Sequence, residues 1–175
     1  KDASCDFPTR LVVPAKKIMA DFPHVGQRGI KAVLDKNKIN YMKKTTFQAS
    51  DLKQKLESLG IKQTNNTIIS IDAKNMYPSV QFGQIVRAVD YFLCDVSSDA
   101  DKETVRRCLK LVKFGMTNTI VTFEDQNWIY GGDAPVELKG LTIGGFKSTF
   151  FADLVAAYIL ENATELFLDS EFYGI

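Results

Sequence analysis

The sequence predicts an α+β fold, with helices lying on one face of a small antiparallel sheet. Two observations support this prediction: apolar residues recur at helical spacing in several segments, and short β-branched runs stand between them. The resulting order is strand, helix, helix, hairpin, loop, helix. With 175 residues, 45% of them hydrophobic, the chain can bury one sizeable core and a smaller satellite lobe.

The first third of the chain contains two predicted elements. Residues 9–13 form a short β-branched run that ends at Pro14, which indicates a strand. Residues 15–47 show little clean periodicity and predict no defined element. Residues 48–59 place leucines at helical spacing after Ser50, a residue type that caps helices, so we expect a helix there.

The middle of the chain predicts a strand followed by two helices. Residues 67–72 are rich in β-branched residues and indicate a buried strand. After a turn at Pro78-Ser79, residues 81–95 carry one apolar stripe at helical spacing. A run of cap-forming residues at 97–101 precedes a second helix that extends to about Gly115.

The last third predicts a hairpin, a glycine loop and a long helix. Residues 119–123 and 128–130 form two strand-like runs around the polar turn 124–127. A glycine-bearing loop follows at 139–145, and an apolar helix is expected from about Lys147 to Phe167.

Composition narrows the class of protein. No apolar run approaches the length needed to cross a bilayer, and the first residues show neither an initiating Met nor an apolar signal region. Cys5, Cys94 and Cys108 are too widely spaced for a paired zinc motif, and their odd number argues against a disulfide framework. We therefore expect a fragment of an intracellular protein, in the nucleus or cytoplasm, neither secreted nor bound to a membrane.

Charge is unevenly distributed along the chain. Residues 1–66 contain 13 Lys and Arg against 6 Asp and Glu, whereas the rest of the chain is acidic. A basic segment of this kind can line a phosphate backbone and release counterions. A well-solvated surface explains the same charges, so charge alone leaves nucleic-acid contact open.

Asp72 is the last residue of the predicted strand 67–72, and Tyr77 lies five residues further on. A carboxylate at the end of a rigid strand can serve Mg²⁺, which takes oxygen ligands in octahedral geometry. If the turn returns Tyr77 beside that ion, its ring can form the floor of a sugar pocket. The simpler alternatives are that Asp72 caps the turn and that Tyr77 packs in the core.

The string Asp72-Ala73-Lys74-Asn75-Met76-Tyr77 resembles motif A of reverse transcriptases, Asp-x-x-x-x-Tyr/Phe. In that family the motif supplies a metal-binding carboxylate and an aromatic gate against the ribose 2′-hydroxyl. The same string, continued by Pro78-Ser79-Val80, is also similar to a motif of B-family DNA polymerases.

Residues 140–154 discriminate between the two families. They resemble motif B of reverse transcriptases, in the Gly-x-x-x-Gly-x-x-x-Ser-x-x-x-Ala-Asp-Leu form of Penelope-like retroelements. Gly144 lets backbone approach a nucleotide, and Ser148 can hydrogen-bond nearby backbone; a glycine turn before a core helix is the simpler alternative. Two positions depart from the family: Ile143 replaces a common Gln, which puts a contact to the nucleotide there in doubt, and Thr149 replaces a common Pro.

The resemblance covers residues 66–170 and implies a right-hand polymerase: a fingers-like basic segment at 1–66 and a partial palm at 67–175. It implies two-metal nucleotidyl transfer with two Mg²⁺ ions, an RNA template, a DNA primer and deoxynucleoside triphosphates. It assigns Asp72 as the catalytic metal ligand, with the Ala73 backbone as a second ligand. The nucleotide-binding residues that it implies are Arg10, Asn75, Met76, Tyr77, Gly144 and Ser148.

Motif C of the family, an aromatic-x-Asp-Asp hairpin, has no counterpart in this chain, and the chain contains no Asp-Asp pair. We therefore expect this fragment to be inactive alone. A B-family or other palm DNA polymerase, or a noncatalytic nucleic-acid-binding domain derived from a polymerase, are the alternative functions. The sequence predicts no oligomeric state.

Overall fold

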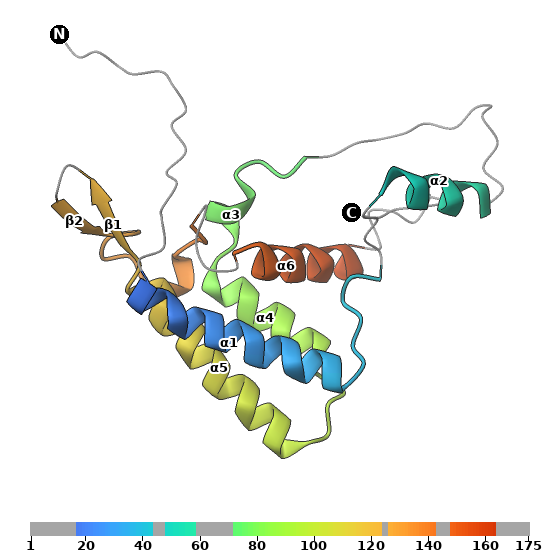
Figure 1. Cartoon of the computed structure of the whole chain (residues 1–175), viewed down its shortest axis with the longest axis horizontal. Helices are drawn as coiled ribbons and strands as arrows, with labels where there is room; N and C mark the ends of the chain where they lie inside the picture. The colour runs from blue at the N-terminus through green and yellow to red at the C-terminus, as the bar shows by residue number, and fades with distance from the viewer. Residues whose placement is uncertain (1–16, 44–47, 59–71, 124–125, 143–147, 164–175) are drawn as a thin grey trace, which may run out of the picture.

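A computed structural model describes residues 17–43, 48–58, 72–123, 126–142 and 148–163 of the chain. Over these residues the fold is rich in helix and carries one small antiparallel sheet (Figure 1). None of the described helices combines the length and the apolar character that a bilayer-spanning segment requires. In chain order the elements are α1 (Lys17–Lys36), α2 (Ala49–Ser58), α3 (Met76–Ser79), α4 (Phe82–Phe92), α5 (Asp99–Thr117), β1 (Ile120–Phe123), β2 (Gln126–Ile129), the 3-10 helix η1 (Val136–Leu138) and α6 (Ser148–Asn162).

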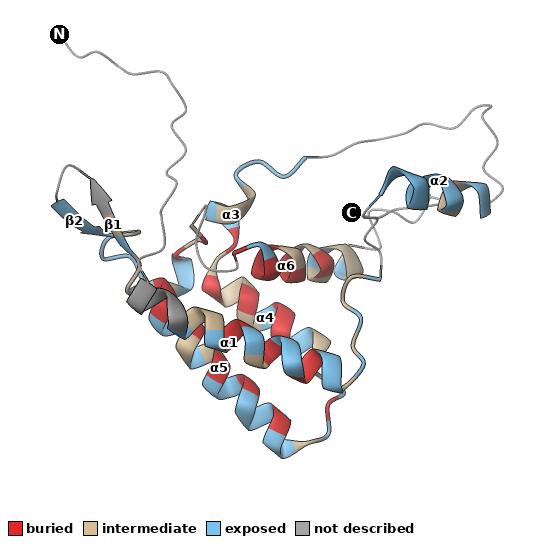
Figure 2. Ribbon diagram, in the orientation of Figure 1, coloured by how far each residue is buried: buried red, intermediate tan, exposed pale blue. Residues whose placement is uncertain are grey.

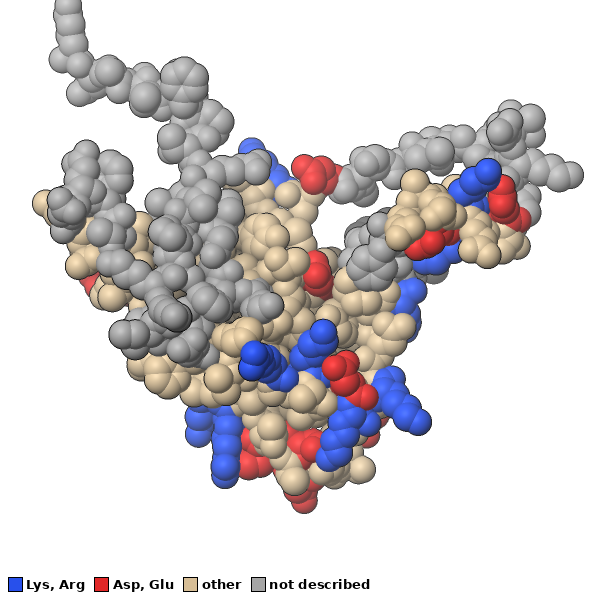
Figure 3. All heavy atoms as spheres, in the orientation of Figure 1, with Lys and Arg blue, Asp and Glu red and all other residues tan. Residues whose placement is uncertain are grey.

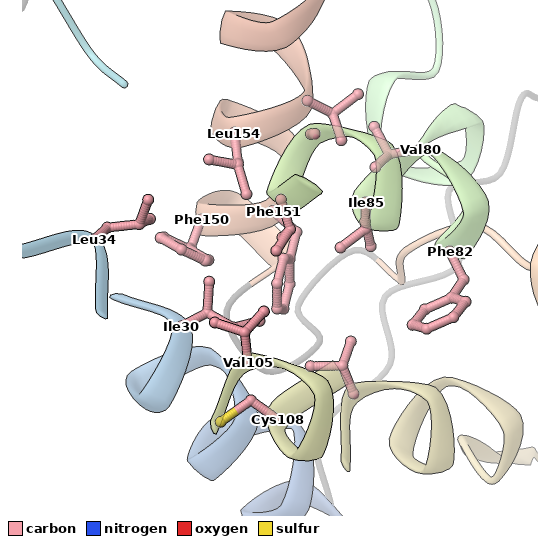
Figure 4. Packing of buried hydrophobic residues seen from close by; sticks show 14 of the residues in the cluster. Ile30, Leu34, Val80, Phe82, Ile85, Val105, Cys108, Phe150, Phe151 and Leu154 are labelled. Carbon is pink, nitrogen blue, oxygen red and sulfur yellow. The ribbon is translucent and has the colours of Figure 1, made fainter. Parts of the chain in front are cut away.

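The hydrophobic core lies between α1, α4, α5 and α6, which turn their buried faces toward one another (Figure 2). Ile30 and Leu34 of α1 point toward Phe150 and Phe151 of α6, with Ile85 of α4 on the far side (Figure 4). The amphipathic helices thus bury their apolar stripes against each other rather than against the sheet. Helix α2 contributes no buried residue.

Helices α1 and α5 pack antiparallel at very short range, because glycines line their contact. A Cβ atom on Gly26 would lie 2.6 Å from the carbonyl oxygen of Cys108, and one on Gly29 would overlap the Cys108 sulfur. A Cβ atom on Gly115 of α5 would likewise overlap the ring of Pro23. The missing side chains let the two backbones approach, as small residues do at other close helix crossings.

Each end of this helix pair is closed by side chains. At one end the rings of Phe22 and Phe114 meet edge to face, with centroids 5.2 Å apart. At the other end Lys36 Nζ lies 2.8 Å from Asp101 Oδ1, and Asn37 Nδ2 donates to Asp101 Oδ2 at 3.2 Å. Both donors hold the pKa of Asp101 below its usual range. The helix pair thus joins residues on the two sides of the predicted boundary at 66/67 into one core.

Helix α1, the longest described, occupies a region for which the sequence predicted no element. Pro23, Gly26 and Gly29 lower its intrinsic helix propensity and hid its periodicity. The helix ends in a Schellman motif, in which the Ile39 N–H donates to the Leu34 carbonyl at 2.9 Å. Lys38 occupies the left-handed position of that motif, with φ 54°, where glycine is usual.

The other predicted helices are confirmed with adjusted ends. Helix α2 spans Ala49–Ser58, so Ser50 lies inside the helix and the prediction that it caps the helix is wrong. Helix α5 begins at Asp99, inside the cap-forming run rather than after it, and the Ser98 side chain caps the helix by accepting a hydrogen bond from the Asp101 N–H. Helix α4 begins with a capping box between Gln81 and Gln84.

The predicted hairpin is present, and its register pairs Ile120 with Ile129 and Val121 with Trp128. Gln126 and Asn127 belong to β2, so the predicted four-residue turn at 124–127 is too long. Every residue of β2 is exposed. The mixed helix and strand content agrees with an α+β fold. Among the described residues, the sheet consists of the two strands of this hairpin. The predicted strands at 9–13 and 67–71 lie outside the described residues.

Candidate functional site

The segment that follows Asp72 folds as a tight turn onto the core. Asp72 and Ala73 are exposed and belong to no helix or strand. Asn75 adopts the left-handed conformation (φ 52°, ψ 43°), which Asn tolerates better than most residues. This conformation turns the chain into α3, whose Met76 and Tyr77 are half-buried and pack against the hydrophobic core.

Pro78 is compatible with this local structure because α3 consists of a single turn. The first turn of a helix has N–H groups without intrahelical partners, so proline loses no hydrogen bond there. The Val80 N–H closes the turn by donating to the Met76 and Tyr77 carbonyls, each at 3.1 Å. The single turn thus holds the backbone of Tyr77, whose half-buried side chain packs against the core.

The start of the glycine loop lies directly against α3. The Leu141 N–H donates to the Tyr77 carbonyl at 2.9 Å and approaches the Val80 carbonyl at 3.2 Å. Gly140 forms an isolated antiparallel bridge with Gln81, and a Cβ atom at position 140 would overlap the Pro78 carbonyl. Glycine is therefore required at this position for steric reasons.

Ser148 closes the same loop from its other end. Its side chain is buried at the first position of α6, and its Oγ donates to the Thr142 carbonyl at 2.8 Å. This confirms the prediction that Ser148 hydrogen-bonds nearby backbone. Its role in binding a nucleotide stays a prediction. Gly144 lies between these two anchored residues, outside the described part of the chain.

Lys139 anchors the loop to the hairpin and was missed by sequence reasoning. The residue is buried, its aliphatic stem lies across the turn at Gly131, and its Nζ donates to the Gly132 carbonyl at 2.9 Å. Gly131 and Gly132 both have positive φ, which suits the turn that receives this stem. Nothing in the sequence indicated that Lys139 is buried, because most lysines in proteins are exposed.

Further along α6, Asp153 is half-buried. Burial raises the pKa of its carboxyl group. Burial also raises the pKa of Tyr41, and the charges of Asp153 and then Asp35 add to that shift. The Asp153 carboxyl and the Tyr41 hydroxyl are thus close enough for their charges to interact.

The predicted metal ligands fit Mg²⁺ only in part. The Asp72 carboxylate and the Ala73 carbonyl are oxygen donors, which is the ligand type that Mg²⁺ prefers, and the ion retains several waters in many sites. Within the described ranges, no group of three or more His, Cys, Asp or Glu residues is placed to hold a metal ion. Asp72 and Ala73 remain predicted ligands.

The basic surplus of residues 1–66 is reduced by ion pairs. Lys36 pairs with Asp101 and Lys43 with Glu161 at 3.1 Å, two acids that lie outside this segment, whereas Lys53 pairs with Glu57 of the same segment at 3.8 Å. Figure 3 shows Lys and Arg side chains interspersed with Asp and Glu on the face it displays, rather than one continuous basic surface. Arg10, the predicted triphosphate ligand, lies outside the described residues.

The arrangement brings Asn75, Met76, Tyr77 and Ser148 to one end of the helical core, together with Gly140 and Lys139. Both cysteines in the described part of the chain, Cys94 and Cys108, are free. No protein-family model, curated protein or solved structure matches this chain.

Proposed function

We propose that this chain is the fingers and partial palm of an RNA-directed DNA polymerase. It would extend a DNA primer on an RNA template by two-metal nucleotidyl transfer. In this proposal Asp72 and the Ala73 carbonyl hold Mg²⁺, and Tyr77 lies under the sugar of the incoming deoxynucleotide. Magnesium supplies charge neutralisation at the triphosphate and activation of the primer 3′-oxygen.

One observation carries the proposal: two segments that are far apart in sequence, and that resemble motifs A and B, are in direct contact. The Leu141 N–H bonds to the Tyr77 carbonyl, and Gly140 packs on Pro78. A nucleotide held between a metal-binding turn and a glycine loop needs this adjacency, because effective transfer depends on holding the reacting groups in fixed positions.

The second support is that the segments resembling motifs A and B are each held in place by their own contacts. Tyr77 packs against the core, and the described residues on the two sides of the loop are held by the Lys139–Gly132 and Ser148–Thr142 hydrogen bonds. Sites whose side chains are held by packing and neighbouring hydrogen bonds keep the precision that catalysis requires. Asp72, by contrast, is exposed and available to an ion.

Primer extension tests the proposal, in a chain continued past Ile175 through the acidic pair that the resemblance implies. With Mg²⁺ and an RNA template, Asp72→Asn should lower extension by at least 100-fold, since each 1.4 kcal/mol lost in the transition state is about tenfold in rate. The matched control is Asp90→Asn, which removes an exposed carboxylate from α4. Full activity in Asp72→Asn would refute the ligand assignment.

The gate is tested separately by Tyr77→Val. This variant should incorporate ribonucleotides more readily while retaining extension with deoxynucleotides. Unchanged discrimination between the two sugars would remove Tyr77 from the proposed pocket.

Extension on DNA but not on RNA templates would favour a B-family or other palm DNA polymerase. Binding of RNA without extension would favour a noncatalytic domain.

A further inference from the structure

A cavity of about 400 Å³ lies where three segments of the chain meet. Its walls come from the residues after α1, from the end of α4 with the residues that follow it, and from the last turn of α6. Figure 1 shows the ends of these three helices on the same side of the core. The lining residues that matter below are Ile39, Lys43, Tyr91, Phe92, Asp95 and Glu161. We call this space the helix-end cavity.

The helix-end cavity is separate from the candidate site. Ser148, which closes the glycine loop, is the first residue of α6, whereas Glu161 lies in the last turn of the same helix. At 1.5 Å per residue, α6 is about 20 Å long. A ligand in the helix-end cavity would therefore not touch the segments that resemble motifs A and B.

Aromatic rings form one wall of the cavity. The Tyr91 and Phe92 rings meet edge to face with centroids 5.1 Å apart, and the Tyr91 ring meets that of Tyr158 at 5.3 Å. Phe92 packs against the core, while 39% of the Tyr91 surface remains exposed. Aromatic rings attract a cation that lies over their faces, and sites for small molecules combine such rings with a few charged groups. This wall suits an organic ligand.

The charged side chains of the cavity leave one carboxylate uncompensated. Lys43, Asp95 and Glu161 are the charged residues in its lining. Lys43 Nζ lies 3.1 Å from Glu161 Oε2, so these two charges largely cancel. Asp95 is exposed and forms no ion pair with another described residue. The side chains thus give the cavity a net negative charge.

The helix ends add to this negative potential. Helices α1, α4 and α6 all have their C-terminal ends at the cavity, since Ile39 follows α1, Phe92 ends α4 and Glu161 lies near the end of α6. The C-terminal end of a helix carries the equivalent of about half a negative charge and favours cations. An anion would be repelled by both the helix ends and Asp95. The electrostatics therefore select a positively charged ligand.

We propose that the helix-end cavity binds a small organic cation that carries an alkylammonium group. The charged group lies between the Asp95 carboxylate and the rings of Tyr91 and Phe92. The volume is near the lower end of the range for small-molecule sites, which suits a ligand of few heavy atoms. The inference goes beyond the proposed function and does not depend on polymerase activity, because the site lies at the other end of α6.

Titration of the full 175-residue chain, followed by nuclear magnetic resonance of its backbone amides, tests the site. The probe is choline, and its matched control is the alcohol in which a carbon atom replaces the charged nitrogen. Choline should shift the Ile39, Tyr91 and Asp95 amides in a saturable way, with a Kd of about 1 mM or lower. The uncharged alcohol should bind more weakly by about fivefold or more. Equal binding of the two probes, or no saturation with choline, would overturn the proposal.

Charge substitutions identify the groups that hold the cation. Asp95→Asn should weaken choline binding by about fivefold or more and leave binding of the alcohol unchanged. Lys43→Gln should strengthen choline binding by about twofold or more, because it leaves the Glu161 carboxylate uncompensated. The matched control is Asp133→Asn, which removes an exposed carboxylate from the turn after the hairpin and changes the net charge equally. It should alter the Kd by less than about twofold.

Two further results would overturn the proposal. The first is an equal loss of affinity in Asp95→Asn and Asp133→Asn, which would mean that choline responds to the net charge of the chain and not to this cavity. The second is the same set of amide shifts with potassium chloride at the concentration of choline, which would identify ordinary counterion attraction. The comparison of choline with the alcohol uses the unmodified chain, so it decides the question even if a variant fails to fold.

Discussion

The α1–α5 helix pair and the β1–β2 hairpin share one end of the molecule but are stabilised in different ways. In the helix pair, glycines bring two backbones together and the apolar side chains are buried around them. In the hairpin, Ile129 and Trp128 are large apolar residues left more than half exposed. The difference shows that a hydrophobic sequence stabilises an element only where another surface covers it.

The sharpest test compares the same substitution in the two regions. Ile30→Ala removes a fully buried side chain from α1 and should lower the free energy of unfolding by about 2–5 kcal/mol. Ile129→Ala removes an exposed one and should change it by about 0.5 kcal/mol or less. Urea denaturation followed by circular dichroism measures both. Equal effects would contradict the contrast between the two regions.

The glycine contact can be broken and then repaired. Gly29→Ala and Gly26→Ala should each cost about 1–3 kcal/mol, because the added Cβ overfills the α1–α5 contact. Cys108→Ala should rescue Gly29→Ala, whose obstacle is the Cys108 sulfur. It should not rescue Gly26→Ala, whose obstacle is the Cys108 carbonyl oxygen. A double-mutant cycle in urea measures the coupling, and equal rescue of both variants would refute this packing.

A residue in the left-handed conformation follows α1 and another follows the hairpin, Lys38 and Gly131. Replacing them should change the free energy of unfolding in opposite directions. Lys38→Gly should raise the free energy of unfolding by roughly 0.5–1 kcal/mol, because glycine adopts positive φ without strain. Gly131→Ala should lower it by about 1 kcal/mol, since φ is 74° there. Thermal unfolding measures both changes. A stabilised Gly131→Ala would mean that this turn does not need a left-handed residue.

The smallest expected effect is the pH dependence at the Lys36 end of the helix pair. Because its pKa is depressed in the folded state, Asp101 contributes stability above the ordinary aspartate pKa. That contribution is lost as the pH falls through that range toward the depressed value. The unmodified chain should therefore lose more stability than Asp101→Asn between neutral pH and about pH 3. Parallel urea titrations at both pH values measure this, and identical losses would remove Asp101 from the acid response.

The sequence predicted the elements whose pattern depends on local residues. The apolar stripe of α4, the Ser98 cap of α5 and the two strand runs of the hairpin are each visible within a short window. Helix α1 was missed because its glycines and Pro23 serve a tertiary contact and so weaken the local helical pattern. A propensity argument cannot detect a residue that is chosen for a partner far away in sequence.

The candidate site was predictable in the same partial way. The sequence singled out Tyr77 and Ser148, which lie at the two anchored segments of the site. It did not single out Lys139, and it placed Gly140 in the loop without its contact to Pro78. Lys139 binds the turn at Gly132, and Gly140 packs on the Pro78 carbonyl. Both contacts depend on the tertiary fold, which the local sequence does not specify. The metal site stays a prediction, because Asp72 alone supplies a carboxylate in the described turn.

The close approach of α1 to α5 has a consequence for how such chains can be recombined. Residues of α1 cover Cys108 and Val112 of α5. If residues 1–66 were replaced by an unrelated segment, these two core residues of α5 would lose the helix that buries them. A chimaera that joins residues 67–175 to a foreign segment would need glycines at matching positions of its own leading helix. The two halves should therefore vary together between lineages and resist exchange as independent modules.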